Sequence, residues 1–201
     1  NGKTKVTSSG TNCALANFAS VNINNVDFTT PDGAFYNTSN KVLHDNNANI
    51  VKTCVIQLKN YLIRIMDEDL TSANYKTVCA KYPGMSFNPA YSMLTLKNVN
   101  ISKSTMGSAI WVQKPSTIVL EGINKISSNR FRPIEFAANS TIEGTGTLYV
   151  TSTADPDGAS IGAHAMCTSN NATLTIKDCH IIADASAASK ARGVAAYDKG
   201  T

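Results

Sequence analysis

A short alternating pattern recurs along this chain and restricts what it can fold into. Residues 94–101 read apolar, polar, apolar, polar, Asn, apolar, polar, apolar, which indicates two strands of period two joined at an Asn corner. Copies of the pattern begin at Val21, Ile56, Leu94, Ile118, Ile142 and Leu174. Asn, Asp or Gly stands at the corners, as a backbone with positive φ favours. The chain is therefore predicted to be a repeat protein.

The later copies also contain a third short strand, in which two apolar residues flank one outward residue. These strands are predicted at residues 110–112, 134–136, 161–163 and 194–196. Three strands and three corners in each copy predict an all-β fold, a right-handed parallel β-helix (solenoid) of about six to seven three-strand rungs. The inward residues should include Leu94, Leu96, Val99, Ile101, Ile110 and Val112. One apolar column should contain Val26, Tyr61, Val99, Ile123 and Cys179.

The extent of the pattern bears on domain organisation. Copies run from about Cys13 to the last residues, so a single β-helix domain over residues 1–201 is expected. The chain starts without Met and ends where another rung would open, which indicates a fragment of a longer chain. Two long excursions, residues 29–47 and 66–90, are candidate binding loops on this scaffold.

Composition excludes several classes of protein. Charged residues are 16% of the chain and the net charge is +4, without the dense Lys/Arg runs of a nucleic-acid-binding surface. No stretch approaches the ~18 apolar residues of a membrane span. The five cysteines match no zinc pattern, and Cys179 and Cys13 are expected to be buried thiols. No cofactor is predicted, except that Asp155 and Asp157 could hold Ca²⁺ through carboxylate oxygens.

The C-terminal half resembles a known type of module. Residues 142–150 (IEGTGTLYV), residues 158–163 (GASIGA), Cys167 and residues 172–176 (ATLTI) are similar to bacterial extracellular surface proteins with a right-handed β-helix fold, some of them carbohydrate-binding. The resemblance covers residues 94–201. It implies an extracellular or cell-surface location, and a polysaccharide or a host or cell-surface glycan as partner.

A candidate ligand-binding site follows from the third strand. Its outward residues include Trp111 and Glu135, which should be neighbours about 4.8 Å apart on adjacent strands. An exposed indole beside a carboxylate suits a sugar, because the ring packs on the sugar face and the carboxylate accepts from its hydroxyls. Arg130 and Arg132 precede the strand and favour an acidic glycan. The alternative is that Trp111 is covered by a loop.

These observations leave three functions open. The first is a non-catalytic extracellular module that binds carbohydrate or acts as an adhesin. The second is a polysaccharide lyase or hydrolase, because pectate lyases and polygalacturonases share the expected fold. However, the Asp-Asp pair and the Arg-Ile-Lys of polygalacturonases are absent, and Arg64-Ile65-Met66 departs from the latter at its third residue. Glu135 is one acid without a placed partner, which is too little for hydrolysis, so no catalytic residue is predicted. The third is a structural shaft of a phage tail or surface fibre.

Overall fold

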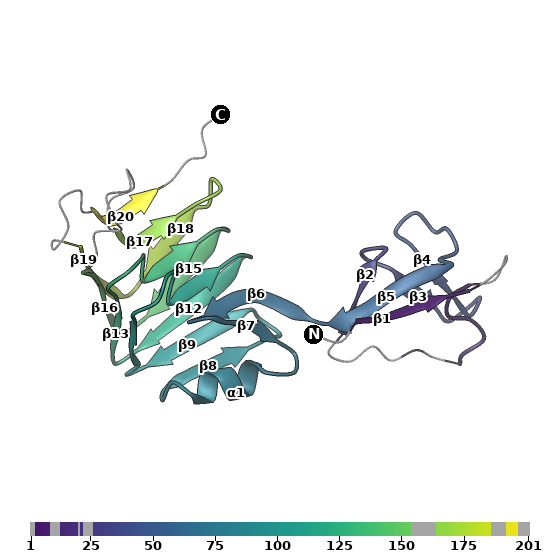
Figure 1. Ribbon diagram of the computed structural model, residues 1–201, viewed down its shortest axis with the longest axis horizontal. Helices are drawn as coiled ribbons and strands as arrows, with labels where there is room; N and C mark the ends of the chain where they lie inside the picture. Colours follow the sequence, from purple (N-terminus) through teal and green to yellow (C-terminus); the bar gives the residue numbers. More distant parts are fainter. Residues whose placement is uncertain are drawn as a thin grey trace. The chain divides into compact units, whose positions relative to one another are not determined.

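The computed structural model describes residues 3–8, 13–19, 21, 26–153, 164–185 and 192–196. The chain divides into two compact units. The N-terminal unit consists of residues 1–59 and 71–73, and the C-terminal unit of residues 60–70 and 74–201. The strand labels used below are those of Figure 1.

The N-terminal unit is built from antiparallel strands. β5 (Thr53–Leu58) lies between β1 (Lys3–Thr7) and β2 (Val26–Thr30) and is antiparallel to both. β3 (Phe35–Asn37) and β4 (Val42–His44) form a separate antiparallel pair. Burial of a small apolar cluster holds this unit together: Cys13, Phe28, Leu43, Val51 and Cys54.

The C-terminal unit begins with elements that are not in parallel register. β6 (Asn60–Ile65) pairs with β7 (Glu68–Thr71) and runs antiparallel to β11 (Ile110–Val112). The short helix α1 (Tyr75–Ala80) buries Val78 and Cys79, and β8 (Met85–Asn88) is antiparallel to β9 (Met93–Lys97).

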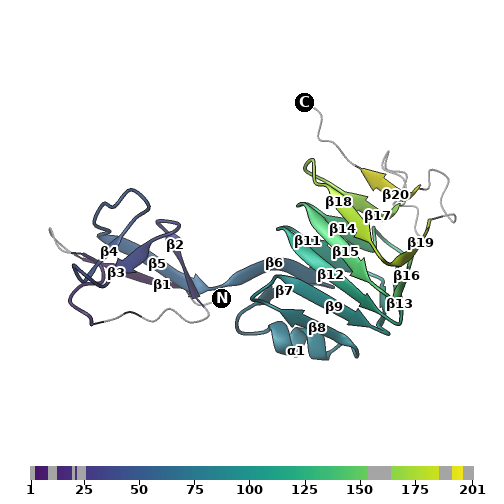
Figure 2. The same cartoon turned by 180° about the vertical axis from the view of Figure 1, so that it is seen from behind.

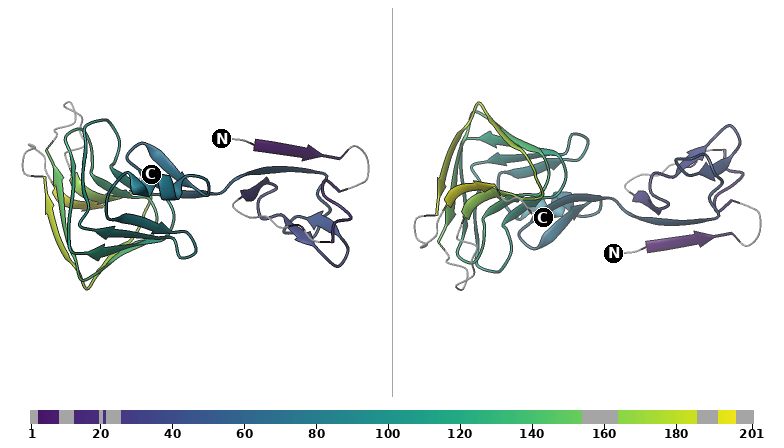
Figure 3. Two further views of the ribbon diagram at one scale, coloured as in Figure 1. Left: turned by 90° about the horizontal axis from the view of Figure 1, so that it is seen from below. Right: turned by 90° about the horizontal axis from the view of Figure 1, so that it is seen from above.

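From β9 onward the strands pair in parallel within three sheets. One sheet has the order β18 (Leu174–Lys177), β15 (Ser140–Gly144), β12 (Ser116–Glu121), β9 and β8. The second has the order β10 (Asn100–Lys103), β13 (Ile123–Ser128), β16 (Thr147–Ser152) and β19 (His180–Asp184). The third has the order β20 (Arg192–Ala196), β17 (His164–Thr168), β14 (Ile134–Phe136), β11, β6 and β7. We call β9–β10–β11 and each following trio a layer, because each trio gives one strand to each sheet. Figure 2 shows the strands of successive layers side by side, and Figure 3 shows the three sheets around a common interior.

The predicted fold, a right-handed parallel β-helix solenoid of six to seven rungs, is wrong. The described strands form five separate sheets, and those of the N-terminal unit are antiparallel. Alternation of apolar and polar residues specifies which face of a strand is buried, but not its partner or its direction. Residues 26–28 and 56–58 share the alternation, yet they pair antiparallel, Val26 opposite Leu58 and Phe28 opposite Ile56. Residues 22–25 of that first copy lie outside the described residues.

The inward assignment for residues 94–112 is confirmed. The six residues named for the core are all buried, with 5% exposure or less: Leu94, Leu96, Val99, Ile101, Ile110 and Val112. Third strands are also found where expected at residues 110–112 and 134–136, and residues 194–196 belong to β20. The expected strand at residues 161–163 lies outside the described residues, and β17 at residues 164–168 pairs with β14.

The predicted apolar column is wrong at Val26, which belongs to the N-terminal unit, and at Tyr61, which lies in the third sheet. It is also wrong at Ile123, which is 57% exposed. Asn124 takes the inward position instead and is fully buried. Lys97 and Asn98 separate Leu96 from Val99, whereas Glu121, Gly122 and Ile123 separate Leu120 from Asn124. The additional corner residue shifts the strand by one position, which exchanges its two faces. Cys179 is therefore not stacked on Ile123; it is half-buried, and its thiol lies 3.7 Å from the carbonyl oxygen of Ile142.

Candidate ligand-binding site

A column of side chains crosses the outer face of the third sheet. Arg64 of β6 is paired with Trp111 of β11, Trp111 with Glu135 of β14, and Glu135 with Cys167 of β17. The neighbours of Trp111 along the strand, Ile110 and Val112, are fully buried. Because side chains alternate between the faces of a strand, this burial directs Trp111 outward. Trp111 and Glu135 are thus cross-strand neighbours, as the sequence predicted.

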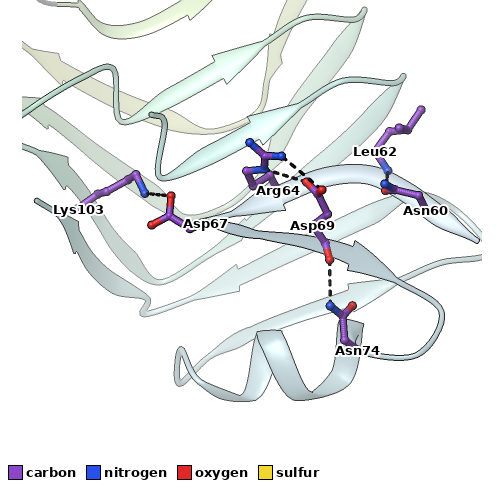
Figure 4. Close-up of polar contacts among 7 residues, drawn as sticks. All are labelled: Asn60, Leu62, Arg64, Asp67, Asp69, Asn74 and Lys103. Atoms are coloured by element: carbon purple, nitrogen blue, oxygen red, sulfur yellow. Dashed lines mark hydrogen bonds and ion pairs between the residues drawn. The ribbon is translucent and has the colours of Figure 1, made fainter. Parts of the chain in front are cut away.

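Arg64 covers one face of the Trp111 ring. Its guanidinium carbon lies 5.3 Å from the ring centroid, within the distance of a cation–π contact. Figure 4 shows the same guanidinium on Asp69, with Nε 2.8 Å from Oδ1 and Nη2 3.3 Å from Oδ2. The hydrogen bond to Asp69 raises the pKa of Arg64. This two-pronged pair fixes the guanidinium plane over the indole.

Glu135 is held by three donors. Nη1 of Arg132 lies 3.3 Å from Oε2, and the two side chains are 13% and 14% exposed. The hydroxyl of Ser108 donates to Oε2 at 3.2 Å, and that of Ser169 donates to Oε1 at 3.1 Å. The carboxylate is therefore oriented by groups from three different segments of the chain.

A hollow of about 260 Å³ lies beside this column. Its lining combines apolar and polar side chains: Arg64, Met66, Asp67, Met106, Gly107, Ser108, Trp111, Phe131 and Glu135. The indole Nε1 of Trp111 is buried and has no hydrogen-bond partner among the described residues. A buried donor without an acceptor costs roughly 1–3 kcal/mol.

Asp67, which also lines the hollow, belongs to a third ion pair. Nζ of Lys103 lies 2.6 Å from Oδ1 of Asp67, and the Thr105 hydroxyl donates to Oδ2 at 3.2 Å. The hydrogen bond from Lys103 lowers the pKa of Asp67. Asp67 is therefore an anion at neutral pH.

The structure brings three of the four predicted site residues together. Trp111 and Glu135 line the hollow, and Arg132 contacts Glu135. The guanidinium carbon of Arg132 also lies 4.8 Å from the centroid of the Phe131 ring. Arg130 does not join them. It is exposed, and its backbone N–H donates to the Ser128 hydroxyl at 3.3 Å. The ligand-binding role of these residues stays a prediction.

Sequence reasoning missed Arg64, Asp67 and Met106 at this site. The alternation of Tyr61, Ile63 and Ile65 in β6 already places Arg64 on the outer face. The antiparallel pairing of β6 with β11 carries no such sequence signal, and Met106 belongs to the turn between β10 and β11.

No metal site is found in the part of the chain that the structure describes, where no group of three or more His, Cys, Asp or Glu side chains comes together. The suggested Ca²⁺ ligands Asp155 and Asp157 lie outside that part. The described residues also contain no helix that is long and apolar enough to cross a membrane.

Searches among family models, curated proteins and solved structures gave no match to this chain. The resemblance of residues 94–201 to bacterial surface proteins therefore stays a prediction. The same holds for an extracellular location.

Proposed function

We propose that this chain is a non-catalytic binding module that holds a carbohydrate in the hollow beside Trp111. The observation that carries the proposal is the indole N–H of Trp111, which is buried without a partner among the described residues and belongs to a ring that lines the same hollow as Glu135 and Ser108. Sugar hydroxyls both donate and accept hydrogen bonds. One hydroxyl can accept from the indole while a neighbouring hydroxyl donates to the carboxylate.

The charges around the hollow favour a neutral sugar over an acidic one. Arg64 is paired with Asp69, Lys103 with Asp67, and Arg132 with Glu135. Each cation is thus already matched by an anion. The preference for an acidic glycan was based on arginines without a partner. Because Arg132 is paired with Glu135, it no longer favours an acidic glycan.

Hydrolysis is less well supported by this geometry. A general acid needs a pKa raised toward neutrality, whereas the pKa of Asp67 is lowered by Lys103. Glu135 is held by Arg132, Ser108 and Ser169. A shaft function has no specific observation in its favour.

The proposal is tested by measuring the binding of neutral and acidic oligosaccharides to the whole chain and to two Trp111 variants. Trp111→Ala removes the ring and should weaken binding about tenfold, a loss of about 1.4 kcal/mol. Trp111→Phe keeps a ring and removes only the N–H, so an intermediate loss is expected. Tyr149→Ala is the matched control, because Tyr149 is a partly exposed aromatic residue (38%) on another sheet.

Two outcomes would contradict the proposal. One is the absence of oligosaccharide binding by the wild-type chain. The other is equal affinity of wild type and Trp111→Ala, with far-ultraviolet circular dichroism confirming that both are folded.

A further inference from the structure

A second hollow lies on a different sheet of the C-terminal unit. Its volume is about 530 Å³, and it is lined by Tyr91, Pro115, Ser116, Thr117, Asn139, Ser140, Thr141, Thr173 and Thr175. All these residues are uncharged, in contrast to the ion pairs around Trp111. We infer that this surface, which we call the threonine groove, binds a linear neutral polysaccharide.

A row of hydroxyls runs along the groove across successive strands. Thr117 of β12 is paired with Thr141 of β15, and Thr141 with Thr175 of β18. Adjacent strands are about 4.8 Å apart, so the row offers one hydroxyl at each such step. Ser116 and Ile118, the neighbours of Thr117, are buried, which directs Thr117 outward.

The three threonine hydroxyls are available to a ligand. None of them makes a hydrogen bond within the described part of the chain. The hydroxyls of Ser116 and Ser140, in contrast, donate to the carbonyls of Lys114 and Ala138. The threonine side chains are also stiff at χ1, because they are branched at Cβ. Ordering them on binding therefore costs little entropy.

Two further residues add an aromatic ring and an amide donor to the row of hydroxyls. Tyr91 is 76% exposed and lines the groove, where its ring can pack against the C–H face of a sugar. Oδ1 of Asn139 accepts from the backbone N–H of Thr173 at 2.8 Å, which leaves the amide NH₂ of Asn139 to donate. Threonine alone is common on solvent-facing strands. The combination of the row with an exposed aromatic ring and a hollow distinguishes this surface.

The chemistry of the groove selects the class of ligand. A hydroxyl is both donor and acceptor, so a row of them matches a polymer that carries neutral hydroxyls along its length. A nucleic acid or an acidic glycan would need cations, and the groove has none among its lining residues. The inference does not depend on the Trp111 hollow, which lies on another sheet.

The test is affinity electrophoresis of the whole chain in gels that contain hydroxyethylcellulose, a soluble neutral β-glucan or polygalacturonate. Retardation is expected with a neutral polymer and not with polygalacturonate. Thr141→Val removes the central hydroxyl of the row, and Tyr91→Ala removes the ring. Each should weaken retardation by about threefold to tenfold, which corresponds to about 0.6–1.4 kcal/mol.

Matched controls separate this inference from loss of fold and from the proposed function. Thr95→Val makes the same change on the same sheet outside the groove, at a position paired with Val119, and should leave retardation unchanged. The inference would be overturned if Thr141→Val and Thr95→Val were retarded equally. It would also be overturned if neither neutral polymer slowed the migration of the wild-type chain. Loss of retardation in Trp111→Ala alone would overturn the threonine groove while supporting the Trp111 hollow. The reverse pattern would support the groove and reject that hollow.

Discussion

The ammonium of Lys103, a side chain only 1% exposed, lies 2.6 Å from the carboxylate of Asp67, a side chain 68% exposed. The pair therefore joins the interior of the C-terminal unit to its surface (Figure 4). Lys103 occupies an inward position aligned with Ser128, which is also buried. A buried cation is tolerated only when an anion lies beside it. The buried ammonium of Lys103 therefore requires the loop that brings the carboxylate of Asp67 to it.

The first prediction is that the two partners are not equivalent on substitution. Asp67→Ala leaves the buried ammonium without its partner and should lower the free energy of unfolding by on the order of 2 kcal/mol, less than for a pair buried on both sides. Lys103→Met replaces the cation by an apolar side chain and should change the free energy of unfolding by less than about 1 kcal/mol.

Unfolding in urea, followed by the fluorescence of the single Trp of the chain, reports on this unit. Lys97→Met is the control, because the Lys97–Glu121 pair is exposed and should contribute less than about 1 kcal/mol. A larger loss for Lys103→Met than for Asp67→Ala would contradict this account.

The second prediction concerns acid. The pKa of Asp67 is lowered in the folded state by Lys103, so the folded state binds this proton less readily than the unfolded state. The resulting stability is present above about pH 4, the ordinary range of an Asp carboxyl, and is lost as the pH falls below it. Asp67→Asn should remove this part of the acid dependence. Urea midpoints of both proteins from pH 6 to pH 3 provide the measurement, and parallel curves would show that the pair does not contribute.

Much of the strand pattern was predictable, because burial of alternate residues produces an alternation of apolar and polar residues in the sequence. Leu94, Leu96 and Val99 are examples, and so is the outward direction of Trp111. Pairing direction produces no such pattern, which is why the sequence places β5 and β6 in parallel rungs although β5 is antiparallel to β1 and β2 and β6 is antiparallel to β11. The candidate site was predicted in part for the same reason. Its strand residues follow from alternation, whereas Asp67 and Met106 are brought in by turns.

The third prediction concerns the cysteines. All five are free thiols, and burial raises the pKa of Cys79 to about 11 and that of Cys167 to about 12. The thiolate is the reactive form, so neither residue should be labelled by a thiol reagent in the native protein at pH 8. Burial also raises the pKa of Cys179, but this thiol is only half-buried, whereas Cys79 and Cys167 are buried. Cys179 should therefore be labelled before the other two.

Peptide mass spectrometry after timed labelling identifies the modified residue. Labelling in urea is the control, since all the thiols should then react at similar rates. Modification of Cys167 ahead of Cys179 in the folded protein would contradict the burial described here.

The fourth prediction concerns Asn124. Its Oδ1 accepts from the backbone N–H of Val99 at 2.9 Å, and its Nδ2 donates to the carbonyls of Glu121 at 3.1 Å and Thr147 at 3.4 Å. Asn124→Leu leaves these buried groups without a partner and should cost roughly 1–3 kcal/mol. Asn124→Asp places a carboxylate against two carbonyls and should cost more.

Lys125→Leu is the control for Asn124, because Lys125 is the exposed residue next to it. Its urea midpoint should remain close to that of the wild type. If Asn124→Leu unfolds at a higher urea concentration than the wild type, the hydrogen bonds of the amide do not stabilise the corner.

The buried amide of Asn124 also has a consequence for how the chain avoids misfolding. Strands such as β12 and β15 are similar enough in sequence for a folding chain to pair them one layer out of place. Elsewhere along its column the positions are apolar, Val99 before it and Leu148 after it, and such residues tolerate any apolar neighbour. An amide buried among the wrong strands would lack its partners and would penalise that arrangement. Asn124 would thus favour the correct order of layers. An apolar residue at the same position would be compatible with more than one order.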